Sequence, residues 1–291
     1  KKNKKNIYLG SQFSCIQDDY LKFRNLTITN YIKRKKKSNK VKKIIVYFGT
    51  FYQAQDIYYN LFIKLNDKKF DKFKFIFVFG SQILKKKFQK RIKSNKVKNI
   101  KLIGFVKNFS KILYQSTFAI TGSGLINHEK LSIGLPSISV ILANNQFQSV
   151  KYFKEKNFLK IFSLKKFLNI KKESLFNIIN FKNSNFDEKM NVNDALGSRR
   201  VYRLINQKKY LKLSFRRPSI KDILLYYKWV NNRLVRKNSL QNKSISFNDH
   251  KKWFQNKLLE KKNILLICID ENKLPLGQIR YDFSKIDNRY Y

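Results

Sequence analysis

Residues 122–146 combine small and polar side chains with the spacing of a phosphate-binding turn. A strand-like segment ends at Thr121, and Gly122, Ser123 and Gly124 form a turn without bulky side chains, where backbone N–H groups can approach a phosphate closely. The helix expected next directs its positive dipole end at the same place. Glu129, one or two turns into that helix, has a carboxylate that can accept hydrogen bonds from ribose hydroxyls. The pattern predicts a nucleotide-diphosphate site.

Two amide side chains follow the next expected strand. Asn145 and Gln146 open the element after residues 137–142 and are suited to recognition of polar groups. They would lie at the carboxyl ends of parallel strands, where α/β proteins bind ligands. An ordinary βαβ unit with small residues at its turns is the other interpretation, because a lone Gly-rich turn is a weak signal.

Apolar runs alternate with helical stretches from Ile44 onward. This pattern predicts a parallel sheet covered on both faces, with right-handed crossovers, and therefore a Rossmann-like domain. We expect terminal helices over residues 151–210. The expected strands are 44–48, 73–79, 99–105, 118–121 and 137–142. Glycines fall at or just after four strand ends: Gly49, Gly80, Gly104 and Gly122.

A second unit is expected from Leu211 to the last residue. Ser219 and Asp222 have the spacing of a capping box at a helix start. A strand precedes that helix, and a loop, a second helix over 247–260 and a β-hairpin follow it. The β-α-α-β-β order is a separate α+β unit and does not continue the first sheet. The predicted domains are 1–210 and 211–291.

Composition gives broad limits on function. The chain has 291 residues, a net charge of +46 and two cysteines. Lys, Asn, Ile, Phe and Tyr are enriched together along the whole chain, which indicates a general bias and no designed nucleic-acid patch, although the charge favours anionic substrates such as nucleotide sugars. Two distant cysteines give no disulfide framework and no metal-ligand spacing. No apolar run reaches the length of a membrane span, and a cytoplasmic location is expected.

Three stretches in the first half resemble the nucleotide-sugar hydrolase of pseudaminic acid biosynthesis, a family with a two-domain glycosyltransferase-B-like fold. That family removes UDP from UDP-2,4-diacetamido-2,4,6-trideoxy-β-L-altropyranose. The resemblance covers about residues 7–205, and a short GSRRV motif (197–201) resembles the family's closing "GxxRV". The stretches are LGSQFSCIQDDYLKFR (9–24), IIVYFGT (44–50) and GSGLINHEKLSIGLPSISVILANNQ (122–146).

The resemblance implies site residues for a UDP-sugar. Gly122, Ser123, Gly124 and Glu129 would bind the UDP part, and Asn145 and Gln146 would lie at the diphosphate-sugar end. Ser123 replaces one family glycine, Thr50 replaces another, and Asn127 stands near the usual Thr. The family's general base belongs to an N-terminal domain that this sequence does not contain. We therefore expect a fragment, cut at both ends, that is inactive by itself.

The second half resembles the start of a GNAT-family N-acetyltransferase. The resemblance implies acetyl-CoA as cofactor, bound by a loop that would follow Tyr291, and an acceptor pocket shaped by His250 and Trp253. An acetyltransferase precedes the hydrolase in the same pathway, so a fusion would join consecutive steps. The matching stretches are 213–222, 226–240, 245–254 and 275–283.

Two other functions remain open at this stage. A glycosyltransferase-B sugar transferase would share the nucleotide site but pass the sugar to an acceptor. A basic nucleic-acid-binding protein would bind tightly with a steep salt dependence. Arg199 and Arg200 would be either solvated or in contact with a phosphate, and the basic run 33–43 is expected to be a solvated loop.

Overall fold

The computed structural model describes residues 10–33, 41–50, 54–93, 98–155, 159–180, 190–206, 212–239, 241–284, 286 and 288–290. The chain forms two compact units: Lys37–Lys189, here the parallel-sheet unit, and Lys1–Lys36 with Met190–Tyr291, here the split unit. This grouping differs from a division at 210/211, since the segments flanking the sheet belong with the C-terminal part. Residues 207–211 and most of the basic run lie outside the described residues, so that predicted boundary stays a prediction.

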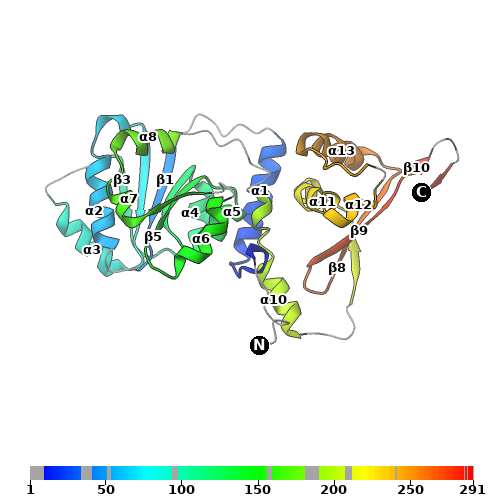
Figure 1. Cartoon of the computed structure of the whole chain (residues 1–291), viewed down its shortest axis with the longest axis horizontal. Coiled ribbons are helices and arrows are strands. Elements are labelled where there is room, and N and C mark those ends of the chain that lie inside the picture. Colours follow the sequence, from blue (N-terminus) through cyan, green and yellow to red (C-terminus); the bar gives the residue numbers. More distant parts are fainter. Residues whose placement is uncertain are drawn as a thin grey trace. The chain divides into compact units, whose positions relative to one another are not determined.

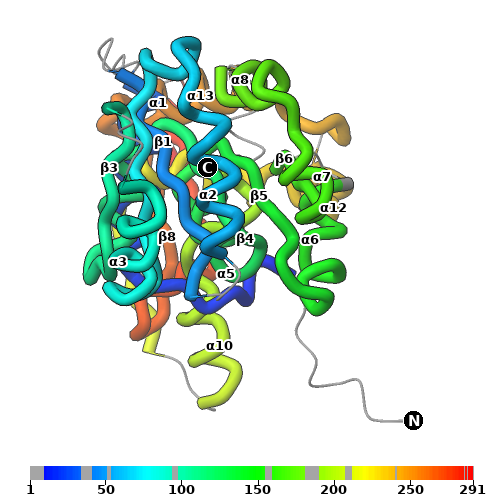
Figure 2. The backbone as a smooth tube through the Cα atoms, turned by 90° about the vertical axis from the view of Figure 1, so that its left-hand side faces the viewer, coloured from blue at the N-terminus to red at the C-terminus, as the bar shows by residue number. Residues whose placement is uncertain are grey.

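The parallel-sheet unit is built on six parallel strands, in the order β3-β2-β1-β4-β5-β6 (Figure 2). Their bounds are Lys42–Tyr47 (β1), Phe73–Val78 (β2), Ile100–Ile103 (β3), Phe118–Gly122 (β4), Ser137–Ile141 (β5) and Lys160–Ser163 (β6). The predicted Rossmann-like parallel sheet is confirmed. The expectation of helices alone over 151–210 was wrong at β6. This four-residue edge strand is only partly buried, so it lacks the long apolar run that marks the inner strands.

Helices cover both faces of this sheet (Figure 1). They are α2 Ala54–Leu65, α3 Gln82–Arg91, α4 Phe109–Gln115, α5 Leu125–Ser132, α6 Gln146–Glu155, α7 Leu164–Leu168 and α8 Lys172–Asn180, with a 3₁₀ turn η3 at Lys68–Phe70. On one face, alternate strand residues such as Ile44, Val46 and Phe77 pack with α2, α3, α7 and α8 in a Phe-rich core. On the other face of the sheet, the ring centroids of Tyr47 and Phe109 of α4 are 4.7 Å apart.

A buried tyrosine ties the ends of two strands together. The Tyr58 hydroxyl of α2 donates to the Val78 carbonyl at 2.5 Å and accepts from the Phe48 N–H at 3.0 Å. Both partners lie at the carboxyl ends of their strands, so this side chain fixes the edge of the sheet where a ligand site is expected.

The split unit contains a three-stranded antiparallel sheet, β7-β8-β9, and a small β10–β11 pair. Helices α11 and α13 pack on each other through Tyr226 and Phe254, with ring centroids 4.9 Å apart. Its elements are η2 Ser11–Phe13, α1 Asp19–Ile32, α10 Gly197–Asn206, β7 Ser214–Arg216, η4 Ile220–Asp222, α11 Ile223–Val230, α12 Arg233–Lys237, α13 Phe247–Leu259, β8 Ile264–Ile269, β9 Pro275–Tyr281, β10 Phe283–Ser284 and β11 Arg289–Tyr290.

The sequence predictions for this unit are confirmed at the hairpin and the helix start. Strands β8 and β9 pair antiparallel, and the Ser219–Asp222 capping box is present. Helix α12 lies in a stretch predicted to be a loop. It is five residues long and buries no side chain, so it carries no apolar period that could reveal it.

Two segments far apart in sequence, 10–24 and 190–201, lie together in the split unit. The Arg24 guanidinium, which is buried, donates to the carbonyls of Met190 at 2.5 Å and Asn193 at 2.9 Å. At Gly197, a Cβ atom would lie 2.1 Å from the Ser14 carbonyl oxygen, so only glycine lets α10 begin this close to the chain.

Candidate functional site

The strand order reverses between β1 and β4, and this position defines the candidate site. From β1 the sheet grows through β2 to β3, and from β4 it grows the opposite way through β5 to β6. Such a switch point opens a crevice at the carboxyl ends of the two strands. A Cβ atom on Gly122 would lie 4.0 Å from Phe48 Cα, which places the two strand ends side by side. Gly49, with φ +74°, makes the turn after β1.

The two glycines of the predicted turn have different reasons to be small. At Gly122 a Cβ atom would lie 2.8 Å from Leu142 Cδ1, so the glycine admits the neighbouring side chain. At Gly124 the backbone is extended (φ 168°), and a Cβ atom would meet nothing within 4 Å. Gly124 is thus required neither by its conformation nor by protein packing, and open space lies above it.

Three successive amides at this turn are available to an anion. Helix α5 begins at Leu125, and the N–H groups of Gly124, Leu125 and Ile126 have no acceptor among the described residues. Ser123 was expected to contribute its own amide, but that N–H donates to the Val140 carbonyl at 2.8 Å and belongs to the sheet. The available amides therefore start at Gly124, the last residue of the turn at Gly122–Gly124 that the sequence indicated.

The Ser123 side chain adds a second polar feature at the same turn. It is 3% exposed, and its Oγ has no hydrogen-bond partner in the described part of the chain. A buried hydroxyl without a partner is costly, so a ligand or water at this position would satisfy it.

Glu129, in helix α5, lies close enough to Tyr47 for its charge to act on the phenol. Burial raises the pKa of the Tyr47 phenol, and the negative charge of Glu129 raises it further. Since Tyr47 is the last residue of β1, the carboxylate lies near the strand end on the other side of the switch point. The ribose contact expected for Glu129 stays a prediction.

A buried lysine organises the turn from beneath. Lys130 is 0% exposed, and its ammonium donates to Thr121 Oγ1 at 2.6 Å and Ser139 Oγ at 2.8 Å. The Thr121 hydroxyl in turn donates to the Gly122 carbonyl at 2.8 Å, and the Ser139 hydroxyl donates to Asn127 Oδ1 at 2.7 Å. The network thereby links the end of β4, strand β5 and the first turn of α5. Burial lowers the pKa of Lys130 to about 7, against the opposing effect of Glu129.

The predicted amide pair lies on the turn after β5, the neighbour of β4. Gln146 Oε1 accepts from the Leu142 N–H at 2.9 Å and so stabilises the turn, which leaves its Nε2 as the group able to meet a ligand. Asn145 is exposed. In the structure, Gly122, Ser123 and Gly124 lie where β4 ends and α5 begins, Glu129 lies within α5, and Asn145 and Gln146 follow the neighbouring strand β5.

The two residues predicted for an acetyltransferase acceptor pocket pack into aromatic surroundings. His250 is 2% exposed, and its Nε2 lies 3.0 Å from the Ile223 carbonyl oxygen. Its ring lies 5.6 Å from the half-buried Trp253 and 5.8 Å from Phe254. Burial lowers the pKa of this histidine. These contacts are those of a packed core residue, and the predicted pocket role stays a prediction.

Arg199 and Arg200, whose role the sequence did not decide, make no described contact with the residues of the candidate site. Arg200 pairs with both carboxylate oxygens of Asp194 and donates to the Gln12 carbonyl at 2.9 Å. Arg199 lies 3.7 Å from Asp18. Both side chains hold the split unit together.

No sequence pattern pointed to Tyr47, Thr121 or Lys130 as parts of the site. Each lies inside or beside an apolar run, where a polar residue has no distinguishing pattern. Their proximity follows only from the order of β1, β4 and β5 in the sheet.

A scan against protein-family models and a search of the curated proteins found no match. Among solved structures, the chain is similar to the UDP-GlcNAc 2-epimerase from Neisseria meningitidis bound to UDP-GlcNAc, with 17% identity over 64% of this chain and 50% of that chain, and a TM-score of 0.42. It is also similar to MurG from Acinetobacter baumannii, with 12% identity over 60% of this chain and 54% of that one, and a TM-score of 0.44.

A third similar structure is the glycotransferase of kitacinnamycin, with 13% identity over 58% of this chain and 43% of that one, and a TM-score of 0.45. The chain spans about half the length of these three structures. Likeness at these scores carries no conclusion about what this chain does. In the part of the chain that the structure describes, none of the helices combines the length and the apolar character needed to cross a membrane.

Proposed function

We propose that the parallel-sheet unit binds the UDP part of a nucleotide sugar at the β1–β4 switch point. One observation carries the proposal: the amides of Gly124, Leu125 and Ile126 have no acceptor among the described residues, and they adjoin open space at the carboxyl end of β4. A helix start with unused N–H groups and a positive dipole end is a site for a phosphate.

In this proposal, different residues around the turn contact different parts of the ligand. The diphosphate lies on the three amides, with the Ser123 hydroxyl as an additional donor. The Glu129 carboxylate accepts from the ribose hydroxyls, and Asn145 and Gln146 face the diphosphate-sugar end. Lys130 contacts no ligand in this arrangement and acts as a positioning residue through Thr121 and Ser139.

The reaction proposed is hydrolysis of a UDP-linked diacetamido-trideoxy sugar, as in the glycosyltransferase-B-like hydrolases that residues 9–24, 44–50 and 122–146 resemble. Water is the nucleophile and UDP the leaving group. The amides of the turn stabilise the charge that develops on the departing diphosphate. No residue of this chain is assigned as the general base.

No step is derived for acetyl-CoA. Residues 212–290 contain one glycine, Gly277, and it lies within strand β9 and not in a turn. The described residues of the split unit therefore do not form a glycine-rich loop for a pyrophosphate. Acetylation of a UDP-aminosugar remains the prediction drawn from the sequence.

Calorimetric titration of UDP into the chain tests the proposal. We expect saturable binding, weaker binding of UMP because it lacks the second phosphate, and about tenfold weaker UDP binding after Glu129→Ala, since a charge-assisted hydrogen bond to ribose is lost. Glu173→Ala is the control, because Glu173 is an exposed carboxylate of the same unit whose only described ion pair is with Lys69. Binding that is absent in the folded wild type, or equally weakened in both variants, would refute the site.

A further inference from the structure

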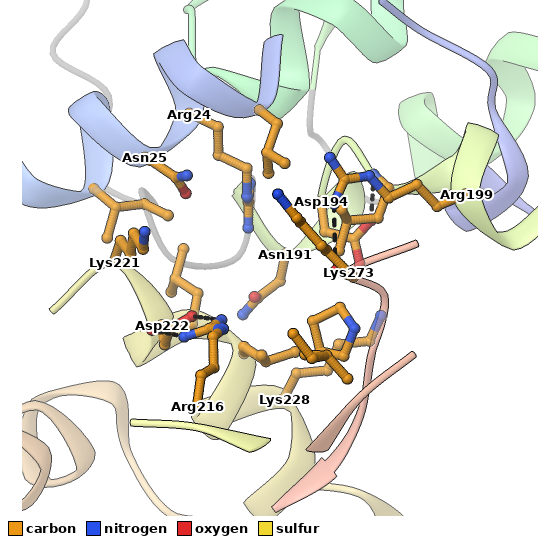
Figure 3. A pocket seen from close by; sticks show the side chains of 17 residues that line it. Arg24, Asn25, Asn191, Asp194, Arg199, Arg216, Lys221, Asp222, Lys228 and Lys273 are labelled. Carbon is orange, nitrogen blue, oxygen red and sulfur yellow. Dashed lines mark hydrogen bonds and ion pairs between the residues drawn. The ribbon is translucent and has the colours of Figure 1, made fainter. Parts of the chain in front are cut away.

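A second cavity, within the split unit, is lined by charged side chains from four segments (Figure 3). Its volume is about 290 Å³. The segments are helix α1, residues 191–199, the stretch from β7 to α11, and the turn between β8 and β9. None of the residues proposed for UDP contributes to it.

Cations dominate the lining of this cavity. Six basic side chains meet two carboxylates, Asp194 and Asp222. The basic residues are Arg24, Arg199, Arg216, Lys221, Lys228 and Lys273. Figure 3 shows the nitrogen ends of Arg24 and Lys273 directed into the space that the labelled side chains surround.

Both carboxylates are already neutralised by arginines. Arg216 forms a two-pronged pair with Asp222, at 2.7 and 2.9 Å, and Arg200 pairs with Asp194 in the same way. Asp222 also accepts from the Ser219 N–H at 2.8 Å. Neither carboxylate is therefore left over to pair with the lysines of the cavity.

The three lysines are the uncompensated groups. No hydrogen bond or ion pair joins the ammonium of Lys221, Lys228 or Lys273 to any residue that the structure describes. Burial lowers the pKa of Lys228, and so do the charges of Arg200 and Arg24, although Asp194 opposes them. Cations gathered in a concave site focus an attractive field on anions.

We propose that this cavity binds a small phosphate-bearing anion with at least two negative charges. The arginine groups that would grip a planar carboxylate are engaged: Arg24 with two carbonyls, Arg216 with Asp222, and Arg199 with Asp18 and the Lys273 carbonyl. The lysines that remain act as point charges and can meet oxygens from several directions, as a phosphate presents them.

The size of the cavity limits the ligand further. Pockets for drug-sized ligands begin at roughly 300 Å³, so about 290 Å³ admits a diphosphate or a small phosphate ester but not a whole nucleotide sugar. The site is separate from the UDP site, and its existence does not depend on that proposal.

Titration calorimetry of the full chain with inorganic pyrophosphate, at about 0.15 M salt to screen exposed lysines, tests the inference. The double variant Lys228→Gln/Lys273→Gln should weaken pyrophosphate binding about tenfold or more, because two charge-assisted contacts are lost. Its UDP titration should match that of the wild type. Lys237→Gln/Lys252→Gln is the control, since both lysines are exposed in the same unit and neither lines the cavity.

Each result has a defined meaning. A loss confined to the cavity variant supports the site. Equal loss in the control, or no loss in the cavity variant, would show that pyrophosphate binds elsewhere on this cationic chain. Citrate that binds as tightly as pyrophosphate, with the same dependence on Lys228 and Lys273, would overturn the assignment to a phosphate.

Discussion

At the scale of single residues, the proposed UDP site is defined by the polar groups that the protein does not already engage. Ser123 gives its amide to the sheet, whereas the next three amides have no acceptor among the described residues. Lys130 is buried, and its ammonium donates to two hydroxyls. A motif in the sequence shows only the residue types, whereas the structure shows which of their polar groups the protein itself engages.

Gly124→Ala is predicted to weaken UDP binding without destabilising the fold. The methyl group enters space that the protein leaves open but the diphosphate needs, so the affinity should fall roughly 5- to 100-fold, the effect of overpacking. Calorimetry with UDP and thermal unfolding would measure the two quantities. Gly277→Ala is the control, because its Cβ also meets nothing within 4 Å and it lies in the split unit. Unchanged affinity in Gly124→Ala would show that the space above Gly124 is not the ligand's.

Lys130 predicts a pH dependence of stability. Burial lowers its pKa from 10.5 to about 7 in the folded chain, so between these values the unfolded chain binds a proton that the folded chain does not. The contribution of Lys130 to the free energy of unfolding therefore rises with pH over this window, by up to about 1.4 kcal/mol per unit, and is constant below it.

The comparison with Lys130→Met isolates this contribution, since other groups titrate alike in both proteins. Urea unfolding followed by circular dichroism, at about pH 6, 8 and 9.5, should show the wild type gaining stability relative to the variant as pH rises through the window. A difference that stays constant across these values would contradict a depressed pKa at Lys130.

At the scale of secondary-structure elements, the sequence was most informative where burial is uniform. The inner strands β1, β2, β4 and β5 are mostly buried and rich in apolar residues, and their runs could be found without a structure. Edge strand β6 and the exposed helix α12 could not, because they lie partly or wholly in water. The spacing of Gly122, Gly124 and Glu129 placed the candidate turn correctly on one strand and helix.

What spacing could not supply is the order of the strands. The pairing of β1 with β4 puts Tyr47 beside Thr121, and the pairing of β4 with β5 puts Thr121 beside Ser139. These contacts join residues far apart in the chain. The cavity of the split unit was even less predictable from the sequence, because Arg24 and Lys273, which both line it, come from opposite ends of the chain.

Asp222→Ala is predicted to destabilise the split unit by about 3 kcal/mol. Asp222 is only 5% exposed, so its loss leaves the Arg216 guanidinium without its buried partner, and it also removes the carboxylate that caps the helix start. Both tryptophans, Trp229 and Trp253, belong to this unit, so their fluorescence during urea unfolding reports on it alone.

Asp249→Ala is the matched change. Asp249 also accepts from a serine three residues earlier, the Ser246 hydroxyl at the start of α13, at 2.6 Å. It is exposed and pairs with no described arginine, so the loss should stay below about 1 kcal/mol. Similar losses in the two variants would contradict the importance given to burial at Asp222.

At the scale of the whole molecule, charge is the dominant feature. With 64 basic and 18 acidic residues, the folded chain repels itself. Salt should therefore stabilise it: the thermal midpoint is predicted to rise by several degrees between roughly 20 and 300 mM sodium chloride, as the Debye length shrinks. A calorimetric scan measures this, with an uncharged osmolyte at equal osmolarity as control. A midpoint that falls with salt would show that attractive ion pairs outweigh the repulsion.

The same charge attracts many anions weakly, so the location of binding matters more than its occurrence. Hydrogen exchange of the full chain, with and without saturating UDP, tests the central claim most directly, because it locates the ligand without any substitution. The account predicts slower exchange in peptides that cover the ends of β1 and β4 and the start of α5, with residues 212–284 unchanged. Protection confined to the split unit, or no protection near Gly124 while UDP is bound, would contradict a nucleotide site at the switch point.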